Sequence, residues 1–203
     1  MLVAKLTKTS NIPILEAGTY PARCIGIIDT GEQWNEMAGK TRREILFLFE
    51  LPTELVEIDG EQKPRYMSQT YTMSMNEKAK MRIALETWRG KAFTEEELRG
   101  FDLTSVVDKP CMLTVVQKQS KNGKTYANIS GIAKLIKGMT IPDAMSTLTV
   151  FDLDAPDALE KLETLPEWIQ NKIKQSETYK EKIAGATEAQ GFMDINPDDL
   201  PFA

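Results

Sequence analysis

Alternation of apolar and polar residues recurs in three segments within the first 75 residues, and this periodicity constrains the fold more than any other feature. A period of two places successive side chains on opposite faces of a β-strand. The segments are GTYPARCIGIIDTG (18–31), REILFLFELP (43–52) and RYMSQTYTMSM (65–75). Glycines bound the first, Pro52 ends the second, and the glycine-containing EIDGEQKP precedes the third. We therefore predict three consecutive β-strands.

The period changes to that of a helix after the third segment. Ser74 with Glu77 fits a capping box, and Gly90 closes the apolar spacing that follows, formed by Met81, Ala84, Leu85 and Trp88. Thr94 with Glu97 predicts a second, shorter helix. Strand character returns at 110–119 and 125–136, joined at Asn122-Gly123, a strong hairpin-turn signal.

Three strands, a helix and a two-stranded hairpin follow the element order of an OB-fold. We expect a mainly β protein, with residues 1–140 forming a five-stranded OB-fold barrel whose helix lies between strands three and four. The alternative is an ordinary α+β domain with the same order. In an OB-fold, strands two and three and the loops between strands one and two and strands four and five bind single strands. Those loops are TGEQWNEMAGKT (30–41) and KQSKNGKT (118–125).

Basic and aromatic residues gather in these loops and on the neighbouring strands. Lysine and arginine release counterions from a phosphate backbone, and exposed aromatic rings stack on unpaired bases. The bland alternative makes the lysines solvated hairpin residues and Trp34 an anchor folded onto the core. Phe47, Phe49, Trp88 and Trp168 are expected in the core. The candidate nucleic-acid-binding residues are Trp34, Lys40, Arg42, Arg43, Tyr66, Tyr71, Lys118, Lys121, Lys124 and Tyr126.

Two GKT triplets, 39–41 and 123–125, do not indicate a phosphate-binding P-loop. That loop needs another glycine five residues before its Gly-Lys, where this chain has Trp34 and Lys118. The chain has no histidine, and Cys24 and Cys111 form no CxxC pair, so we expect neither a zinc site nor a hydrolytic triad. The prediction is no catalysis, no metal and no cofactor.

The C-terminal third differs in charge from the rest of the chain. Residues 1–140 contain 20 Lys and Arg against 17 Asp and Glu, whereas residues 141–203 contain 5 against 13. We predict a helical appendage at 141–184, in which Pro166 opens a helix with Trp168, Ile169 and Ile173 on one face. Carboxylates at Asp152, Asp154 and Asp157 are expected as caps and solvated surface. A flexible acidic tail is expected at 185–203.

The last residues, NPDDLPFA, place an aromatic ring behind two acidic residues at the chain end. DDLPF (198–202) resembles the acidic tip of bacterial and bacteriophage single-stranded DNA-binding proteins. YPARCIGIID, KNGKTYANISGIAKL and LPEWIQNKIKQS likewise resemble the OB-fold single-stranded DNA-binding proteins of tailed phages. One departure is that Ala203 follows the phenylalanine, which usually ends the chain in that family. The resemblance implies that replication or recombination proteins contact Asp198, Asp199, Leu200, Pro201 and Phe202.

These observations lead to one expected function and two alternatives. We expect sequence-independent binding and protection of single-stranded DNA during phage replication and recombination, with partner enzymes recruited through the tip. No apolar run reaches the roughly 20 residues that span a membrane, and no secretory signal is recognised, so the expected location is the bacterial host cytoplasm. A homodimer is left open. The alternatives are an OB-like adaptor that binds protein and, less favoured, a carboxylate-metal nuclease.

Overall fold

The computed structural model describes residues 12–36 and 38–193, in which a single curled antiparallel sheet dominates. Five strands follow one hydrogen-bonded path in the order β3-β2-β1-β4-β5, and a sixth pairs with β1 off that path. They are β1 (Gly18–Asn35), β2 (Lys40–Ile58), β3 (Glu61–Thr72), β4 (Pro110–Gln119), β5 (Thr125–Ala133) and β6 (Thr149–Phe151). The path is that of an OB-like fold, with β3 and β5 as its two edges, so the predicted mainly β class and element order are confirmed.

Strand β1 ties the sheet together because different parts of it pair with different neighbours. Its first residues, Gly18 to Arg23, pair with β4, and Arg23 to Asn35 pair with β2. Register shifts at Cys24/Gly26 and Asp29/Gly31 bend the strand, as β-bulges do. Strand β6, which the sequence analysis did not predict, runs parallel to β1 at residues 26–28.

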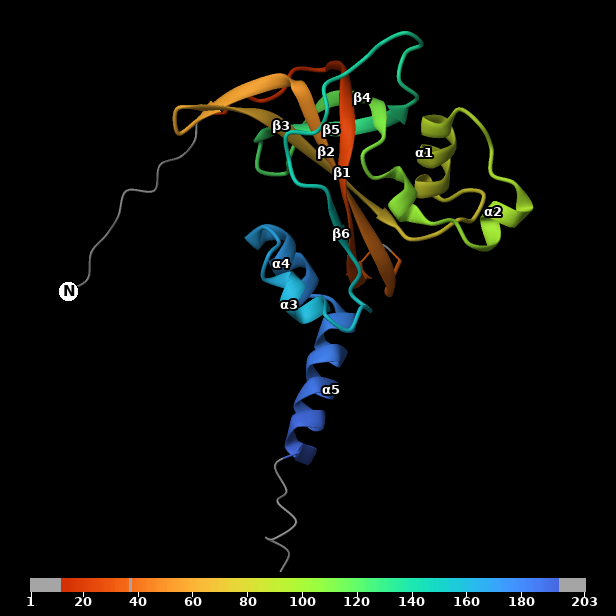
Figure 1. The fold of residues 1–203 in the computed structure, drawn as a ribbon, viewed down its shortest axis with the longest axis vertical. Coiled ribbons are helices and arrows are strands. Elements are labelled where there is room, and N and C mark those ends of the chain that lie inside the picture. Colours follow the sequence, from red (N-terminus) through yellow and green to blue (C-terminus); the bar gives the residue numbers. More distant parts are fainter. Residues whose placement is uncertain (1–11, 37, 194–203) are drawn as a thin grey trace, which may run out of the picture.

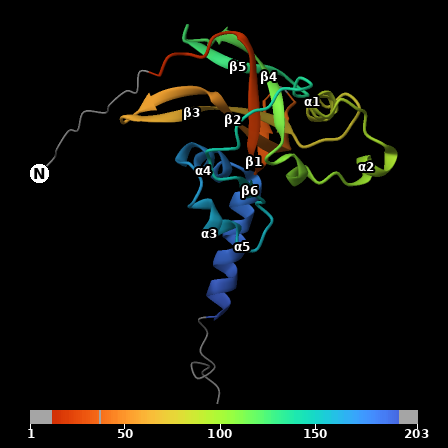
Figure 2. The ribbon, with the colours of Figure 1, turned by 45° about the horizontal axis from the view of Figure 1, so that its top comes forward.

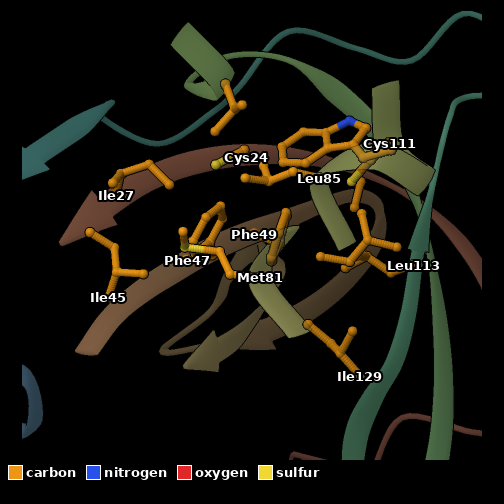
Figure 3. Close-up of a cluster of buried hydrophobic side chains, with 14 of the residues drawn as sticks. Cys24, Ile27, Ile45, Phe47, Phe49, Met81, Leu85, Cys111, Leu113 and Ile129 are labelled. Atoms are coloured by element: carbon orange, nitrogen blue, oxygen red, sulfur yellow. The ribbon is translucent and has the colours of Figure 1, made fainter. Parts of the chain in front are cut away.

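The inner face of the curled sheet encloses the main core. Phe47 and Phe49 are almost fully buried, as predicted, and their side chains converge with those of β1, β4, β5 and α1 (Figure 3). Helix α1 (Lys80–Arg89) contributes Met81, Leu85 and Trp88, and so closes one end of the barrel. Burial raises the pKa of the Cys24 thiol to about 12, so this core cysteine is unreactive near neutral pH.

A second apolar cluster lies on the opposite, outer face of β1 and β2. Ile28 and Leu46 point outward there because alternate residues of a strand face opposite sides. Helices α3 (Ala158–Leu162) and α4 (Glu167–Lys174) cover them, mainly through Leu162, Ile169 and Ile173. Figures 1 and 2 show these helices on one side of the sheet and α1 with α2 (Glu95–Arg99) on another. The appendage is therefore part of the folded body.

Trp168 is a correction to the expected face of α4. The residue is 51% exposed, whereas Ile169 and Ile173 are buried. Trp168 lies one position before Ile169, about 100° around the helix, and faces solvent. The helical spacing correctly assigned the two isoleucines but not the tryptophan.

The two predicted capping boxes have different outcomes. Thr94 and Glu97 form one at α2, with the Thr94 hydroxyl accepting from the Glu97 amide at 3.2 Å. The Ser74 and Glu77 prediction is wrong, because α1 begins at Lys80 and Ser74 Oγ instead accepts from the amide of Asn76. A short 3₁₀ helix (Leu103–Val106) then leads into β4.

Glycine is required where β1 meets the appendage. Gly31 has a φ of 73°, and a Cβ there would lie 2.7 Å from the Ser176 hydroxyl and 2.8 Å from Leu153. Helix α5 (Glu177–Met193) starts beside this point and projects away from the body (Figure 1). It continues past residue 184, where the appendage was expected to end. The expected tip at 198–202 lies outside the described residues, and no helix within them is long and apolar enough to cross a membrane.

Candidate nucleic-acid interface

A groove lies between the β1–β2 hairpin and the segment that links β3 to α1, and we call it the hairpin groove. The β1–β2 side is long because both strands extend far beyond the part of the sheet that β4 covers. The open volume is about 920 Å³, and Asn35, Ala38, Lys40, Thr41, Arg42, Arg43, Thr72, Ser74, Asn76, Lys78, Ala79 and Lys80 line it.

The hairpin groove is positively charged, and its lining contains no acidic residue among those that the structure describes. Lys40 and Arg42, both predicted, lie there with Lys78 and Lys80, which the sequence analysis missed. Within the described residues none of these four has a salt-bridge partner. Unpaired cations at this density suit a polyanion.

Arg43 occupies the same groove but its charge is already paired. Its guanidinium contacts Asp29 on β1 and, at 2.7 Å, Asp154 of the appendage. The hydrogen bond to Asp29 is the largest cause of a raised Arg43 pKa. The next residue, Glu44, is bound by Lys172 of α4 at 2.8 Å. Two consecutive β2 residues are thus held by the appendage, and Arg43 is less available to phosphate than Lys40 or Arg42.

The second candidate surface is the opening between the edge strands β3 and β5, which we call the seam groove. Its volume is about 500 Å³, and it is lined by Ile12, Ile14, Leu15, Val56, Ile58, Pro64, Arg65, Tyr66, Met67, Ser68, Thr125, Tyr126 and Ala127. Tyr66 is 54% exposed and Tyr126 is 44% exposed. Two predicted rings from distant parts of the sequence therefore line one groove.

The three lysines of the β4–β5 hairpin lie next to the seam groove. Lys118 is the cross-strand partner of Tyr126. Lys121 and Lys124 lie in the turn, where Gly123 adopts the left-handed conformation expected for Asn-Gly. All three side chains are exposed. Lys118 therefore lies across the strand pair from Tyr126 at the edge of the seam groove.

Strand β3 connects the two grooves. Tyr66 lines the seam groove and Thr72 lines the hairpin groove. Thr72 follows Tyr66 by six positions along the strand, which is about 20 Å at about 3.3 Å per residue. The Tyr66 hydroxyl shares a 3.0 Å hydrogen bond with Ser146 Oγ, and Ser146 also donates to the buried carboxylate of Glu50. The segment between β5 and β6, which carries Ser146, therefore orients Tyr66.

Besides the three hairpin lysines, which lie next to the seam groove but do not line it, two predicted aromatic residues lie outside both grooves. The Tyr71 ring packs edge-on against Phe47 with 5.3 Å between ring centroids, and burial raises its pKa to about 12. Tyr71 is partly buried against the main core, and it lines neither groove. Trp34 is 63% exposed on the β1–β2 hairpin opposite Thr41, so it is no anchor folded onto the core. It does not line the hairpin groove.

One group of carboxylates has the composition of a metal site. Oxygens of Asp29, Asp152 and Asp154 lie within 4.8 Å of one another. Asp152 Oδ1 also accepts from the Asp154 amide at 2.9 Å. The Arg43 guanidinium binds Asp29 and Asp154, so a cation would have to displace it. Arg43 thus neutralises part of the negative charge of this group, and among the described residues Asp152 has no ion-pair partner.

Comparison with known proteins adds no relative. No protein-family model matches the chain, and no curated protein matches it either.

Proposed function

We propose that this protein binds single-stranded DNA without sequence preference, along β3 and between the hairpin groove and the seam groove. Its expected role is to protect unpaired strands during phage DNA replication and recombination in the cytoplasm of a bacterial host. The observation that carries the proposal is the combination of unpaired cations in one groove with two exposed tyrosines in the other. Phosphates would contact Lys40 and Arg42, and bases would stack on Tyr66 and Tyr126.

The OB-like topology supports the same surface. In OB-folds, strands two and three and the two flanking loops bind single strands. Here the appendage covers the outer face of β1 and part of β2, whereas β3 keeps Tyr66 and Ser68 exposed. The free path therefore follows β3.

The test is fluorescence anisotropy of a labelled oligonucleotide of about 20 nucleotides, longer than one OB-fold site. We expect tight binding of the single strand, with the logarithm of the association constant falling linearly with the logarithm of salt concentration. Duplex DNA of the same length should bind far more weakly. Equal affinity for duplex and single strand would identify a general polyanion binder. No binding at low salt would reject the proposal.

The adaptor alternative rests on the apolar part of the seam groove, where Ile12, Ile14, Val56 and Ile58 could receive a protein segment. Weak DNA binding that does not change with salt would favour it. A nuclease based on the Asp29 group would instead cut labelled DNA in the presence of magnesium.

Recruitment of partners through the C-terminal tip is a separate part of the proposal. Phe202→Ala keeps every charge and removes only the ring, so DNA affinity should not change while replication or recombination proteins are lost from a pulldown. The matched control is Phe192→Ala, which alters a phenylalanine before the tip. If the wild type and both variants recover the same proteins, the tip has no recruiting role.

A further inference from the structure

A third concave site lies at the C-terminal end of α1, where the barrel end is closed, and we call it the helix-end pocket. Its volume is about 400 Å³, within the range of small-molecule sites. The lining is Trp88, Arg89, Phe101, Ser105, Val106, Lys109, Pro110, Lys134 and Leu135. None of these residues belongs to the hairpin groove or the seam groove.

Three cations meet at this pocket from the ends of three elements. Arg89 is the last residue of α1, Lys109 directly precedes β4, and Lys134 directly follows β5. No acidic residue lines the pocket, and in the described part of the chain neither lysine has a salt-bridge partner. Glu97, outside the lining, pairs with Arg89. Glu86 also acts on Arg89 from outside the lining, so the two lysines supply most of the attraction for a phosphomonoester of about −1.5 to −2 at pH 7.

The Arg89 guanidinium is held in place but not fully hydrogen-bonded. Its Cζ lies 4.1 Å from the centre of the Phe93 ring and 5.3 Å from that of Phe101. Nη1 is buried and has no hydrogen-bond partner among the described residues. A buried donor without a partner is costly, and an anionic oxygen that reached it would remove that cost.

The rest of the pocket offers apolar surface and no free backbone groups at its β4 edge. Pro110 has no amide N–H, and its carbonyl accepts from the Trp88 indole at 2.9 Å. The Lys109 amide donates to Val106, and its carbonyl accepts from Cys24. A peptide strand would find these groups already paired. A ligand with a flat apolar part and a charged group would bind through side chains alone.

We propose that the helix-end pocket binds a nucleoside monophosphate, with its phosphate at Arg89, Lys109 and Lys134 and its base on the apolar floor. The ligand is either a free nucleotide or the phosphorylated end of a DNA strand. The pocket lies at the opposite end of the β4–β5 hairpin from Lys121 and Lys124. The ten residues of β4 place it about 30 Å from that turn. It is a site separate from the proposed interface.

The test is calorimetric titration of the full chain with deoxyadenosine 5′-monophosphate, deoxyadenosine and inorganic phosphate. We expect the nucleotide to bind at least about ten-fold more tightly than either fragment, because each fragment makes only half of the contacts. Lys109→Gln combined with Lys134→Gln keeps most of both side-chain stems and removes two charges, so nucleotide affinity should fall at least about ten-fold. The control, Lys161→Gln with Lys180→Gln, changes two exposed lysines of the appendage and should leave the nucleotide affinity unchanged.

The proposal would be overturned if the wild type and the Lys109/Lys134 variant bound the nucleotide equally well, or if the wild type bound nucleotide and nucleoside equally well. It would also be overturned if the pocket bound a peptide covering residues 194–203 and no nucleotide. Thermal melting checks that both double variants are folded. Oligonucleotides with and without a 5′-phosphate then distinguish the two sources. If the 5′-phosphate raises the affinity of the wild type but not that of the Lys109/Lys134 variant, the ligand is the phosphorylated strand end. If the 5′-phosphate does not raise the affinity of the wild type, the ligand is the free nucleotide. Nucleotide binding without oligonucleotide binding would reject the proposed function alone.

Discussion

The hairpin groove and the seam groove lie at the two ends of β3 and differ in chemistry. The first has four unpaired cations and mostly polar neighbours, whereas the second has two exposed tyrosines set among aliphatic side chains. A charge contact releases counterions and depends on salt, but stacking on a ring changes little with salt. Stacking affinity and salt dependence can therefore be assigned to different parts of one strand.

The largest expected effect comes from the seam groove. Replacing Tyr66 and Tyr126 together by alanine should weaken single-strand binding by about 1 to 3 kcal/mol for each ring that stacks on a base. The slope of affinity against salt should not change. The control keeps both rings and removes both hydroxyls, as Tyr66→Phe with Tyr126→Phe, and should bind nearly as the wild type does. A change in the salt slope of the double alanine variant would contradict the assignment of stacking to the seam groove and of phosphate contacts to the hairpin groove.

Trp34 tests whether the interface extends along the β1–β2 hairpin beyond the hairpin groove. If its exposed ring stacks on a base, binding should quench tryptophan fluorescence and Trp34→Ala should cost about 1 to 3 kcal/mol. Trp168→Ala, which removes a ring on α4 that is also more than half exposed, is the control and should have no effect. Wild-type affinity of Trp34→Ala would confine the aromatic contacts to the seam groove.

The cations should change salt dependence more than base preference. Lys40→Ala with Arg42→Ala removes two phosphate contacts, so the salt slope should flatten by about 1.4 at about 0.7 for each contact, equally for all base compositions. Lys121→Ala with Lys124→Ala should flatten it similarly if the strand also follows the β4–β5 turn. An unchanged salt slope in the first double variant would place the DNA away from the hairpin groove, and in the second it would place the DNA away from the β4–β5 turn. The measurement is oligonucleotide affinity over a range of salt concentrations.

The smallest expected effect concerns the ion pair between Arg43 and Asp154. Asp154→Asn leaves the Asp29 contact in place, and because Asp154 is 61% exposed the loss in stability should be no more than about 1 kcal/mol. Arg43 would become more available to phosphate, so the salt slope should steepen by up to about 0.7. Asp157→Asn is the control because Asp157 pairs with Lys161 and not with Arg43. A flatter slope in Asp154→Asn would contradict competition between Asp154 and DNA.

The sequence predicted what local chemistry determines. Period-two alternation identified the first three strands of the chain, strand character identified β4 and β5, and Asn122-Gly123 identified the turn between them. The inward and outward faces of β2 also follow from alternation. Ser74 failed as a cap because a capping pattern three residues apart recurs by chance, and the backbone here continues as a turn to Lys80.

Long-range contacts account for the remainder. The three-residue β6 is too short for a periodic signal, and only the folded chain brings it beside β1. Arg43 and Tyr71 have residue types suited to DNA binding, but distant partners, Asp154 for one and the core for the other, determine what each can do. Lys78 and Lys80 were missed because they follow the strands in a segment interpreted as helix start.

The position of β1 has a consequence for how the molecule opens. Its residues contribute Ile27 to the inner core and Ile28 to the outer cluster, and its backbone pairs with β2, β4 and β6. Neither apolar cluster can lose its packing without disturbing β1. Barrel and appendage should therefore unfold as one cooperative unit, and the amides of residues 26–28 should be among the last to exchange with deuterium.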